Sequence, residues 1–140
     1  MSDLDEQLRR IARTLGKNEI PEVNNKTLKT YLAYLKKTLE FPCYLTGIED
    51  FSWEERYIFG YGSEAEYEEL KKTQPSYTDT FELLGFDNVI DEGCGILAQV
   101  KRVSDKKKFT LPLADLKAID KRSKNYLLLD DFSVWFVNYR

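Results

Sequence analysis

Residues 95–116 read GILAQVKRVSDKKKFTLPLADL, and residues 125–139 read NYLLLDDFSVWFVNY. The first stretch has apolar residues on both sides of a polar, lysine-rich turn, which predicts a β-hairpin with strands at 96–103 and 108–111. The second stretch is apolar on more than one side. It follows Ser123, a residue that can cap a helix, so it predicts a largely buried final helix. A hairpin and a packing helix therefore decide the fold of the last third of the chain.

The N-terminal part of the chain predicts two amphipathic helices. Apolar residues recur at helical spacing over 5–15, and a glycine follows that can end this helix. A second helix is predicted from Asn24 or Asn25 to about Leu39, because either asparagine can serve as its N-cap. Pro42 then closes the helical region, since proline disfavours helix at the residue before it.

The middle of the chain predicts short strands and one further helix. A capping-box pattern, Ser63 followed by Glu66, predicts a helix over 63–72. Within 47–61 we expect a turn followed by a strand, with a short helical turn at 52–55 as the alternative. The other expected segments are a strand at 41–46, a strand at 79–86, a loop at 87–93 and a short helical or irregular step at 113–119.

These segments predict one α+β domain over residues 1–140. Its parts are the N-terminal helices at 1–40, a sheet at 41–116 that includes an acidic segment at 47–77, and the C-terminal helix at 123–138. The strands are short and joined by turns. This pattern favours a small antiparallel sheet or an SH3-like partial barrel, flanked by the helices.

The composition excludes several kinds of active site. The chain has no histidine, which removes histidine general bases, Ser-His and Cys-His nucleophile pairs and imidazole metal ligands. No glycine-rich phosphate loop is evident, and we expect a protein that is not an enzyme. Two cysteines, Cys43 and Cys94, are too few for a zinc site. Their apolar neighbours predict buried free thiols, with a single disulfide as the alternative.

The sequence also bears on location. The N-terminal residues are acidic and lack the basic and apolar regions of a signal peptide. No apolar run approaches the roughly 20 residues that span a bilayer. We therefore expect a cytoplasmic protein that does not insert into a membrane.

Charge is unevenly distributed along the chain, although the net charge is only -3. Residues 47–69 hold eight acids and one base, whereas residues 99–124 hold nine bases and three acids. The basic run at 101–108 could contact phosphates, but the acidic net charge and the lack of a base-stacking motif argue against nucleic acid as a partner. The two regions can steer oppositely charged partners or pair with each other within the fold.

The acidic loop at 87–93 is the most promising local group of ligands. Asp87, Asn88, Asp91 and Glu92 place four oxygen-bearing side chains within six residues. Calcium takes about six to eight oxygen ligands from carboxylates, carbonyls and water, and the spacing here differs from that of an EF-hand loop. Taken alone, the loop fits either a solvated turn or a cation site.

Four pieces of the sequence occur in the order seen in a known family. They are a tyrosine-rich helix ending in Leu39-Glu-Phe-Pro42, an acidic loop before a hydrophobic strand at 87–100, a Leu-Pro-Leu-x-x-Leu step at 111–116, and the terminal sequence Asp130-Asp-Phe-Ser-Val-Trp135. In this order the chain resembles the small calcium-binding proteins first recognised in cyanobacteria, which have many bacterial relatives. The resemblance covers 31–42 and 86–137, and it implies that 47–77 is an insertion.

The resemblance implies a bound calcium ion, with Asp87, Asp91 and Glu92 as the matching acidic ligands. The family carries acids in the helix before Phe-Pro, where this chain has Lys36 and Lys37. Because a cation site loses affinity as the ligand charge falls, we expect calcium binding to be weaker here.

Two functions follow as hypotheses. The first is a metal-binding protein that binds calcium ions with low to moderate affinity through surface carboxylates, loop carbonyls and water. The alternative is a non-catalytic protein–protein interaction module, in which the acidic 47–77 segment and exposed aromatic residues dock a protein partner. Aromatic residues make up 14% of the chain, and such residues are enriched at interfaces. Converging carboxylates favour the first hypothesis, and exposed clustered aromatics favour the second.

Overall fold

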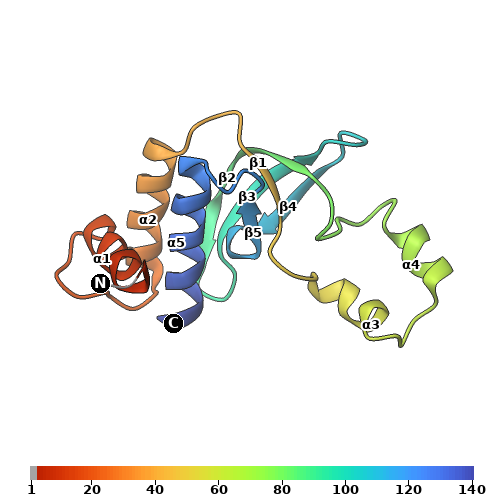
Figure 1. The fold of residues 1–140 in the computed structure, drawn as a ribbon, viewed down its shortest axis with the longest axis horizontal. Coiled ribbons are helices and arrows are strands. Elements are labelled where there is room, and N and C mark those ends of the chain that lie inside the picture. Colours follow the sequence, from red (N-terminus) through yellow and green to blue (C-terminus); the bar gives the residue numbers. More distant parts are fainter. Residues whose placement is uncertain (1–2) are drawn as a thin grey trace.

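Helices α2 (Asn25–Thr38) and α5 (Lys124–Asn138) lie side by side over one face of a β-sheet in the computed structural model, which describes residues 3–140 (Figure 1). Helix α1 (Asp3–Thr14) packs on the outer side of this pair and contacts α5. The apolar residues of α1 and α2 recur at helical spacing, so each helix turns one face toward the core. None of the described helices is long and apolar enough to cross a membrane.

The sheet contains five antiparallel strands in the order β4-β3-β2-β1-β5. Their bounds are β1 (Tyr44–Gly47), β2 (Phe81–Asp91), β3 (Gly95–Arg102), β4 (Lys108–Pro112) and β5 (Leu116–Ala118). Strands β4 and β5 form the two edges of the described sheet, so the sheet is open and not closed into a barrel. The structure confirms the predicted α+β fold, with a small antiparallel sheet and helices from both ends of the chain.

Capping residues set where two of the predicted helices begin. The Asn24 side chain accepts a hydrogen bond from Thr27 N at 2.9 Å, and the Thr27 hydroxyl accepts one from Asn24 N at 2.9 Å. This reciprocal capping box satisfies backbone donors at the start of α2. At the start of α5, Ser123 Oγ accepts a hydrogen bond from Tyr126 N at 3.1 Å and so caps this helix. Both caps are confirmed.

The core between the helices and the sheet is rich in aromatic rings. Tyr31 stacks on Trp135 with ring centroids 5.0 Å apart, and it meets Phe132 edge-on at 5.2 Å. Burial raises the pKa of Tyr31 well above its ordinary value. Trp135 is fully buried, and its Nε1 donates to Pro21 O at 2.9 Å, which satisfies its polar atom. The predicted burial of the final helix is confirmed.

Strand β2 runs through most of the segment that the sequence predicts as a loop at 87–93. The register pairs Phe86 with Ala98 and Ile90 with Ile96, so three residues of β2 face one residue of β3. This bulge holds polar residues within the sheet. The loop prediction is therefore wrong, except for the short turn that follows the strand.

Between β1 and β2 the chain leaves the sheet and forms an arm, which we define as residues 51–74. The arm contains a 3-10 turn (Ser52–Glu54) and the short helices α3 (Glu55–Ile58) and α4 (Glu64–Leu70). Figure 1 shows these helices projecting away from the body, on the side opposite the three long helices. The predicted helix at 63–72 corresponds to α4 and is confirmed.

The strand predicted within 47–61 is wrong, and the helical turn considered as its alternative is what forms. Glu54 Oε2 accepts from the backbone N of Phe51 at 3.3 Å, which closes the turn. The aromatic residues that favour a strand in this segment instead stack against α4.

One strand boundary is corrected, and one strand was not predicted. The first strand begins at Tyr44 and not at Phe41. The irregular step at 113–119 contains a 3-10 turn (Leu113–Asp115) followed by β5, which pairs with β1 and adds the fifth strand.

The two cysteines differ in environment, and both are free. Cys43 is buried as predicted, and burial raises the pKa of its thiol to about 11. The predicted burial of Cys94 is wrong, because this residue lies on the exposed turn between β2 and β3.

Candidate functional site

The predicted calcium ligands lie at the C-terminal end of β2 and on the turn that follows it. Asp87 is half-buried in the bulge, and its Oδ1 accepts from the backbone N of Val89 at 3.3 Å. Asp91 is exposed, and its Oδ1 accepts from Gly93 N at 2.7 Å. Each carboxylate therefore uses one oxygen to shape the backbone beside it.

The third predicted ligand, Glu92, contacts a helix. Its Oε1 accepts from the backbone N of Asn25 at 3.1 Å, at the first turn of α2, where the helix dipole favours negative charge. A guanidinium also lies on this turn, because Arg140 Nη1 donates to Gly93 O at 3.0 Å. The positive charge of Arg140 repels any metal ion that approaches this turn.

The structure does not gather the three acids into a ready-made metal site. Within residues 3–140, no group of three or more Asp, Glu or Cys side chains is close enough to hold one ion. The described hydrogen bonds of Asp87, Asp91 and Glu92 nevertheless use only one oxygen of each carboxylate. A carboxylate offers about four lone-pair sites, so the second oxygens can still coordinate a largely hydrated ion. The three carboxylates supply oxygens of the kind that calcium takes, but they do not form a closed site.

Lys36 and Lys37 occupy the last turn of α2 and are exposed. Positive charge is favourable there, because the C-terminal end of a helix carries a partial negative charge. The lysines therefore stabilise the C-terminal end of this helix.

A second acidic feature, which the sequence predictions missed, is a cleft between the start of the arm and α5. The cleft has a volume of about 430 Å³, and its described lining residues include no Lys or Arg. Its acids are Glu49, Asp50, Glu55, Asp115 and Asp130. The first three belong to the acidic segment that is visible in the sequence, but the other two join them only through the fold.

The surroundings in this cleft raise the pKa of Asp115. The walls of the cleft remove part of the hydration of its carboxylate, although the residue keeps an exposed face, and Glu49 adds repulsion. Apolar side chains of Phe51 and Val134 lie on the same walls. A cation that entered the cleft would relieve the repulsion between its acids.

The acidic pair at 130–131 differs in burial, because successive helix residues point about 100° apart, although Gln7 Nε2 donates to both carboxylates. Asp130 lines the cleft and accepts from Gln7 Nε2 at 2.8 Å. Asp131 is buried and accepts from Arg10 Nε and Nη2, both at 3.0 Å. The hydrogen bond to Asp131 raises the pKa of Arg10. Asp131 therefore has a structural role, joining α1 to α5.

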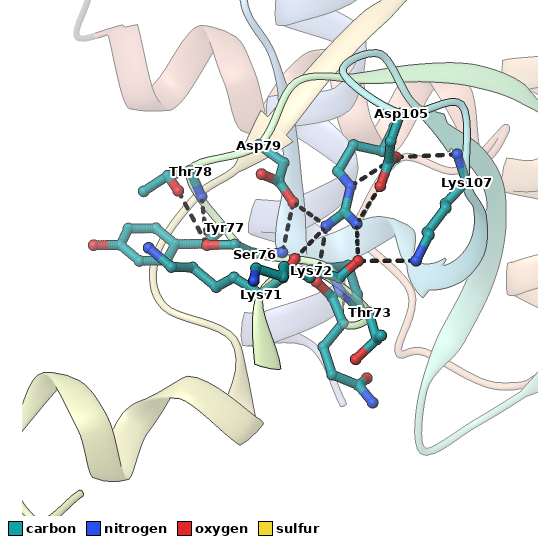
Figure 2. A network of polar contacts seen from close by, with 12 residues as sticks. Lys71, Lys72, Thr73, Ser76, Tyr77, Thr78, Asp79, Asp105 and Lys107 are labelled. Atoms are coloured by element: carbon teal, nitrogen blue, oxygen red, sulfur yellow. Dashed lines mark hydrogen bonds and ion pairs between the residues drawn. The ribbon is translucent and has the colours of Figure 1, made fainter. Parts of the chain in front are cut away.

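The basic run at 101–108 is partly used inside the chain. The guanidinium of Arg102 is buried and donates to three backbone carbonyls at the end of the arm. Figure 2 shows Asp79, Asp105 and Lys107 gathered at the same place, and Lys107 Nζ donates at 2.9 Å to Lys72 O, one of the carbonyls that Arg102 also binds. This network fixes the arm to the hairpin and leaves less of the basic run for an external phosphate.

Neither a protein-family model nor a curated protein sequence matches the chain. Two solved structures have a similar fold. One is described as "Calcium binding protein in the calcium-binding form", with a TM-score of 0.57 and 20% sequence identity over 98% of this chain and 96% of that chain. The other is the crystal structure of Anabaena CcbP, with a TM-score of 0.56 and 20% identity over 96% of this chain and 91% of that chain. The chain therefore has the fold of the cyanobacterial calcium-binding proteins that its sequence resembles.

Proposed function

We propose that the protein is a non-catalytic, cytoplasmic calcium-binding protein of low to moderate affinity. The observation that carries this proposal is the fold similarity, over nearly the whole chain, to a protein described in its calcium-binding form. The acidic surfaces of the chain supply carboxylate oxygens, the ligands that calcium prefers. A sequence without histidine is consistent with a ligand set made of oxygen alone.

The proposed ligands are Asp87, Asp91 and Glu92, completed by backbone carbonyls and water. Binding must draw these acids together from separate positions, and it must overcome the positive charge of Arg140 on the same turn. Both requirements lower the affinity. We therefore expect a dissociation constant on the order of 10⁻⁴ to 10⁻³ M, the range of weak calcium modules.

Backbone amide NMR spectra recorded during a calcium titration would locate the ion. Shifts that cluster at 86–95 support the proposed ligands, whereas shifts that cluster at 48–55 and around Asp115 and Asp130 would move the ion to the cleft. The triple variant Asp87→Asn, Asp91→Asn and Glu92→Gln removes three charges but keeps the acceptor oxygens that hold the turn and the start of α2. We expect it to bind calcium at least about tenfold more weakly than the wild type.

A matched control variant distinguishes calcium binding at the proposed ligands from a general attraction of calcium to the net negative charge. The variant Glu64→Gln, Glu68→Gln and Glu69→Gln removes the same number of charges from exposed positions on α4. Its calcium affinity should stay close to that of the wild type. If the control loses as much affinity as the triple variant, the ions are attracted by net charge and the ligand assignment is wrong.

A further inference from the structure

The arm places two short helices in solvent. Neither α3 nor α4 buries a residue, and they contain four and seven residues. An isolated helix in water needs roughly 12–15 residues to be even marginally stable. The order of these helices must therefore come from side-chain contacts within the arm and at its base.

An aromatic cluster supplies the contacts within the arm. Tyr57 of α3 stacks on Tyr67 of α4 with ring centroids 5.1 Å apart and planes within 7° of parallel. Trp53 packs against both rings, with centroid distances of 6.2 and 5.7 Å. The Tyr57 hydroxyl donates to Glu66 Oε1 at 2.7 Å. At Gly62 an added Cβ would lie 2.4 Å from the Tyr57 ring, so the loop between the helices approaches the cluster closely.

The base of the arm is fixed to the body. Trp53 Nε1 donates to Pro75 O at 2.6 Å, and Oε2 of the buried Glu54 accepts from Tyr77 N at 3.3 Å. Arg102 binds the last carbonyls of the arm from the hairpin. The outer surface of the arm is thus held in one arrangement. A preorganised surface loses less conformational entropy when a partner binds.

Apolar side chains gather at the tip of this arm. Ile58, Phe59 and Tyr61 are 42%, 69% and 80% exposed. Single exposed apolar residues are normal, but these three lie within four positions on a segment that projects from the body. Aromatic side chains at such patches are the residues that contribute most to binding at protein interfaces.

The charge around the tip indicates what kind of partner fits. The arm holds six acids and three bases, but Glu54 is buried, and Lys71 and Lys72 pair with Glu68 and Glu69 at 2.9 Å. Glu55, Glu64 and Glu66 are exposed beside the single base Arg56, so a complementary surface carries Lys or Arg. The basic hairpin of a second copy could supply only part of that surface, through the exposed Lys106 and Lys108. Arg102 is buried, Lys107 donates to a carbonyl of the arm, and Lys101 lies 3.5 Å from Glu82. The complementary charge is better supplied by a different protein.

We propose that the arm tip is a docking surface for a second protein, which presents an aromatic or aliphatic side chain flanked by Lys or Arg. The apolar side chain packs on Phe59 and Tyr61, and the flanking cations face the acids of the arm. Three apolar side chains are far fewer than the roughly 20–30 residues on each side of a standard interface, so the interaction is weak and reversible. This contact uses none of the proposed calcium ligands, Asp87, Asp91 and Glu92.

Fluorescence anisotropy of three labelled peptides of equal length tests the proposal on the full chain, in the presence of a chelator. The first peptide alternates Lys with Leu and Phe, the second alternates Lys with Gly, and the third alternates Glu with Leu and Phe. We expect only the first to bind, with an affinity that falls as the salt concentration rises. The variant Phe59→Ser with Tyr61→Ser should weaken this binding at least about tenfold.

The matched control is Leu4→Ser with Val89→Ser, which removes apolar side chains that are 56% and 64% exposed elsewhere on the chain. It should bind the first peptide as the wild type does. Equal binding of the first two peptides would overturn the proposal, because charge alone would then suffice. Unchanged binding by the Phe59 and Tyr61 variant would also overturn it. The proposal would also be overturned if the free protein self-associates in sedimentation experiments and this variant abolishes the self-association. The occupant of the tip would then be a second copy of the chain.

Discussion

Arg102 and Asp105 form a bidentate ion pair across the turn between β3 and β4, with Nη2 2.7 Å from Oδ2 and Nε 3.0 Å from Oδ1. The same guanidinium donates to Asp79 Oδ2 at 3.0 Å and to carbonyls of the arm (Figure 2). The fixed fork of a guanidinium suits several acceptors at once. One buried cation therefore joins the hairpin, the segment before β2 and the end of the arm.

Replacing Arg102 with Met should destabilise the protein strongly. The change leaves Asp79 and the arm carbonyls without their donor at a site where the wild-type side chain is 4% exposed. Removing one partner of a buried ion pair costs about 3–5 kcal/mol. We expect the lower end of that range in urea unfolding, because both carboxylates can still reach water. Arg102→Lys keeps the charge without the fork and should lie between the wild type and Met. A loss below about 1 kcal/mol for Met would contradict a structural role for this network.

The same pair predicts how stability falls in acid. The hydrogen bond from Arg102 lowers the pKa of Asp105 from 3.8 to about 2. A carboxyl with a lower pKa in the folded state stabilises the fold above its unfolded pKa and loses that contribution as the pH falls through its folded pKa. The contribution is therefore lost between about pH 4 and pH 2. Denaturant unfolding should show that the difference between wild type and Asp105→Asn is constant above this window and shrinks within it. A difference that does not change with pH would disagree with this pairing.

Asp115→Asn should slightly stabilise the protein near neutral pH. The cleft raises the pKa of Asp115, so the folded state disfavours its charged form. A raised carboxyl pKa gives a contribution that is lost as the pH rises above the unfolded value. The melting temperature of the variant should exceed that of the wild type near neutral pH and approach it in acid. Glu49→Gln should act in the same direction by removing repulsion. A lower melting temperature of Asp115→Asn near neutral pH would mean that its carboxylate is stabilising.

Gly95→Ala should destabilise the fold much more than Gly85→Ala. Gly95 has a φ of +74°, and an added Cβ would lie 2.6 Å from the Phe136 ring. The left-handed conformation and the overpacking together should cost about 2–4 kcal/mol. At Gly85 no atom lies within 4 Å of an added Cβ, so alanine there should change the free energy of unfolding by less than about 1 kcal/mol. Comparable losses for the two variants in urea unfolding would contradict this packing.

The sequence was sufficient where neighbouring residues decide the structure. The caps at Asn24 and Ser123 act over three residues, and both were predictable. The arm was harder, because Trp53 and Tyr57 are strand formers by propensity and their partner Tyr67 belongs to a separate helix. Strand β5 has only three residues and forms through pairing with β1, so its own sequence carries little signal.

The features of the candidate site also differ in whether neighbouring residues or distant residues determine them. The closeness of Asp87, Asp91 and Glu92 along the chain was evident, and their role as ligands stays a prediction. The contact between Glu92 and Asn25 joins residues 67 positions apart and has no local signature. The cleft was not predicted either, because the 3-10 turn at Leu113–Asp115 and helix α5 bring its last two acids to the arm only in the folded chain.

Calorimetric titration of calcium into the metal-free protein is the decisive test of the proposed function. Calcium binding at the end of β2 predicts a saturable heat with a dissociation constant on the order of 10⁻⁴ to 10⁻³ M. The same titration of the Asp87→Asn, Asp91→Asn and Glu92→Gln variant should show a heat that saturates only at much higher calcium concentration. No heat beyond dilution at millimolar calcium in the wild type would contradict calcium binding, and an unchanged isotherm in the variant would contradict its location.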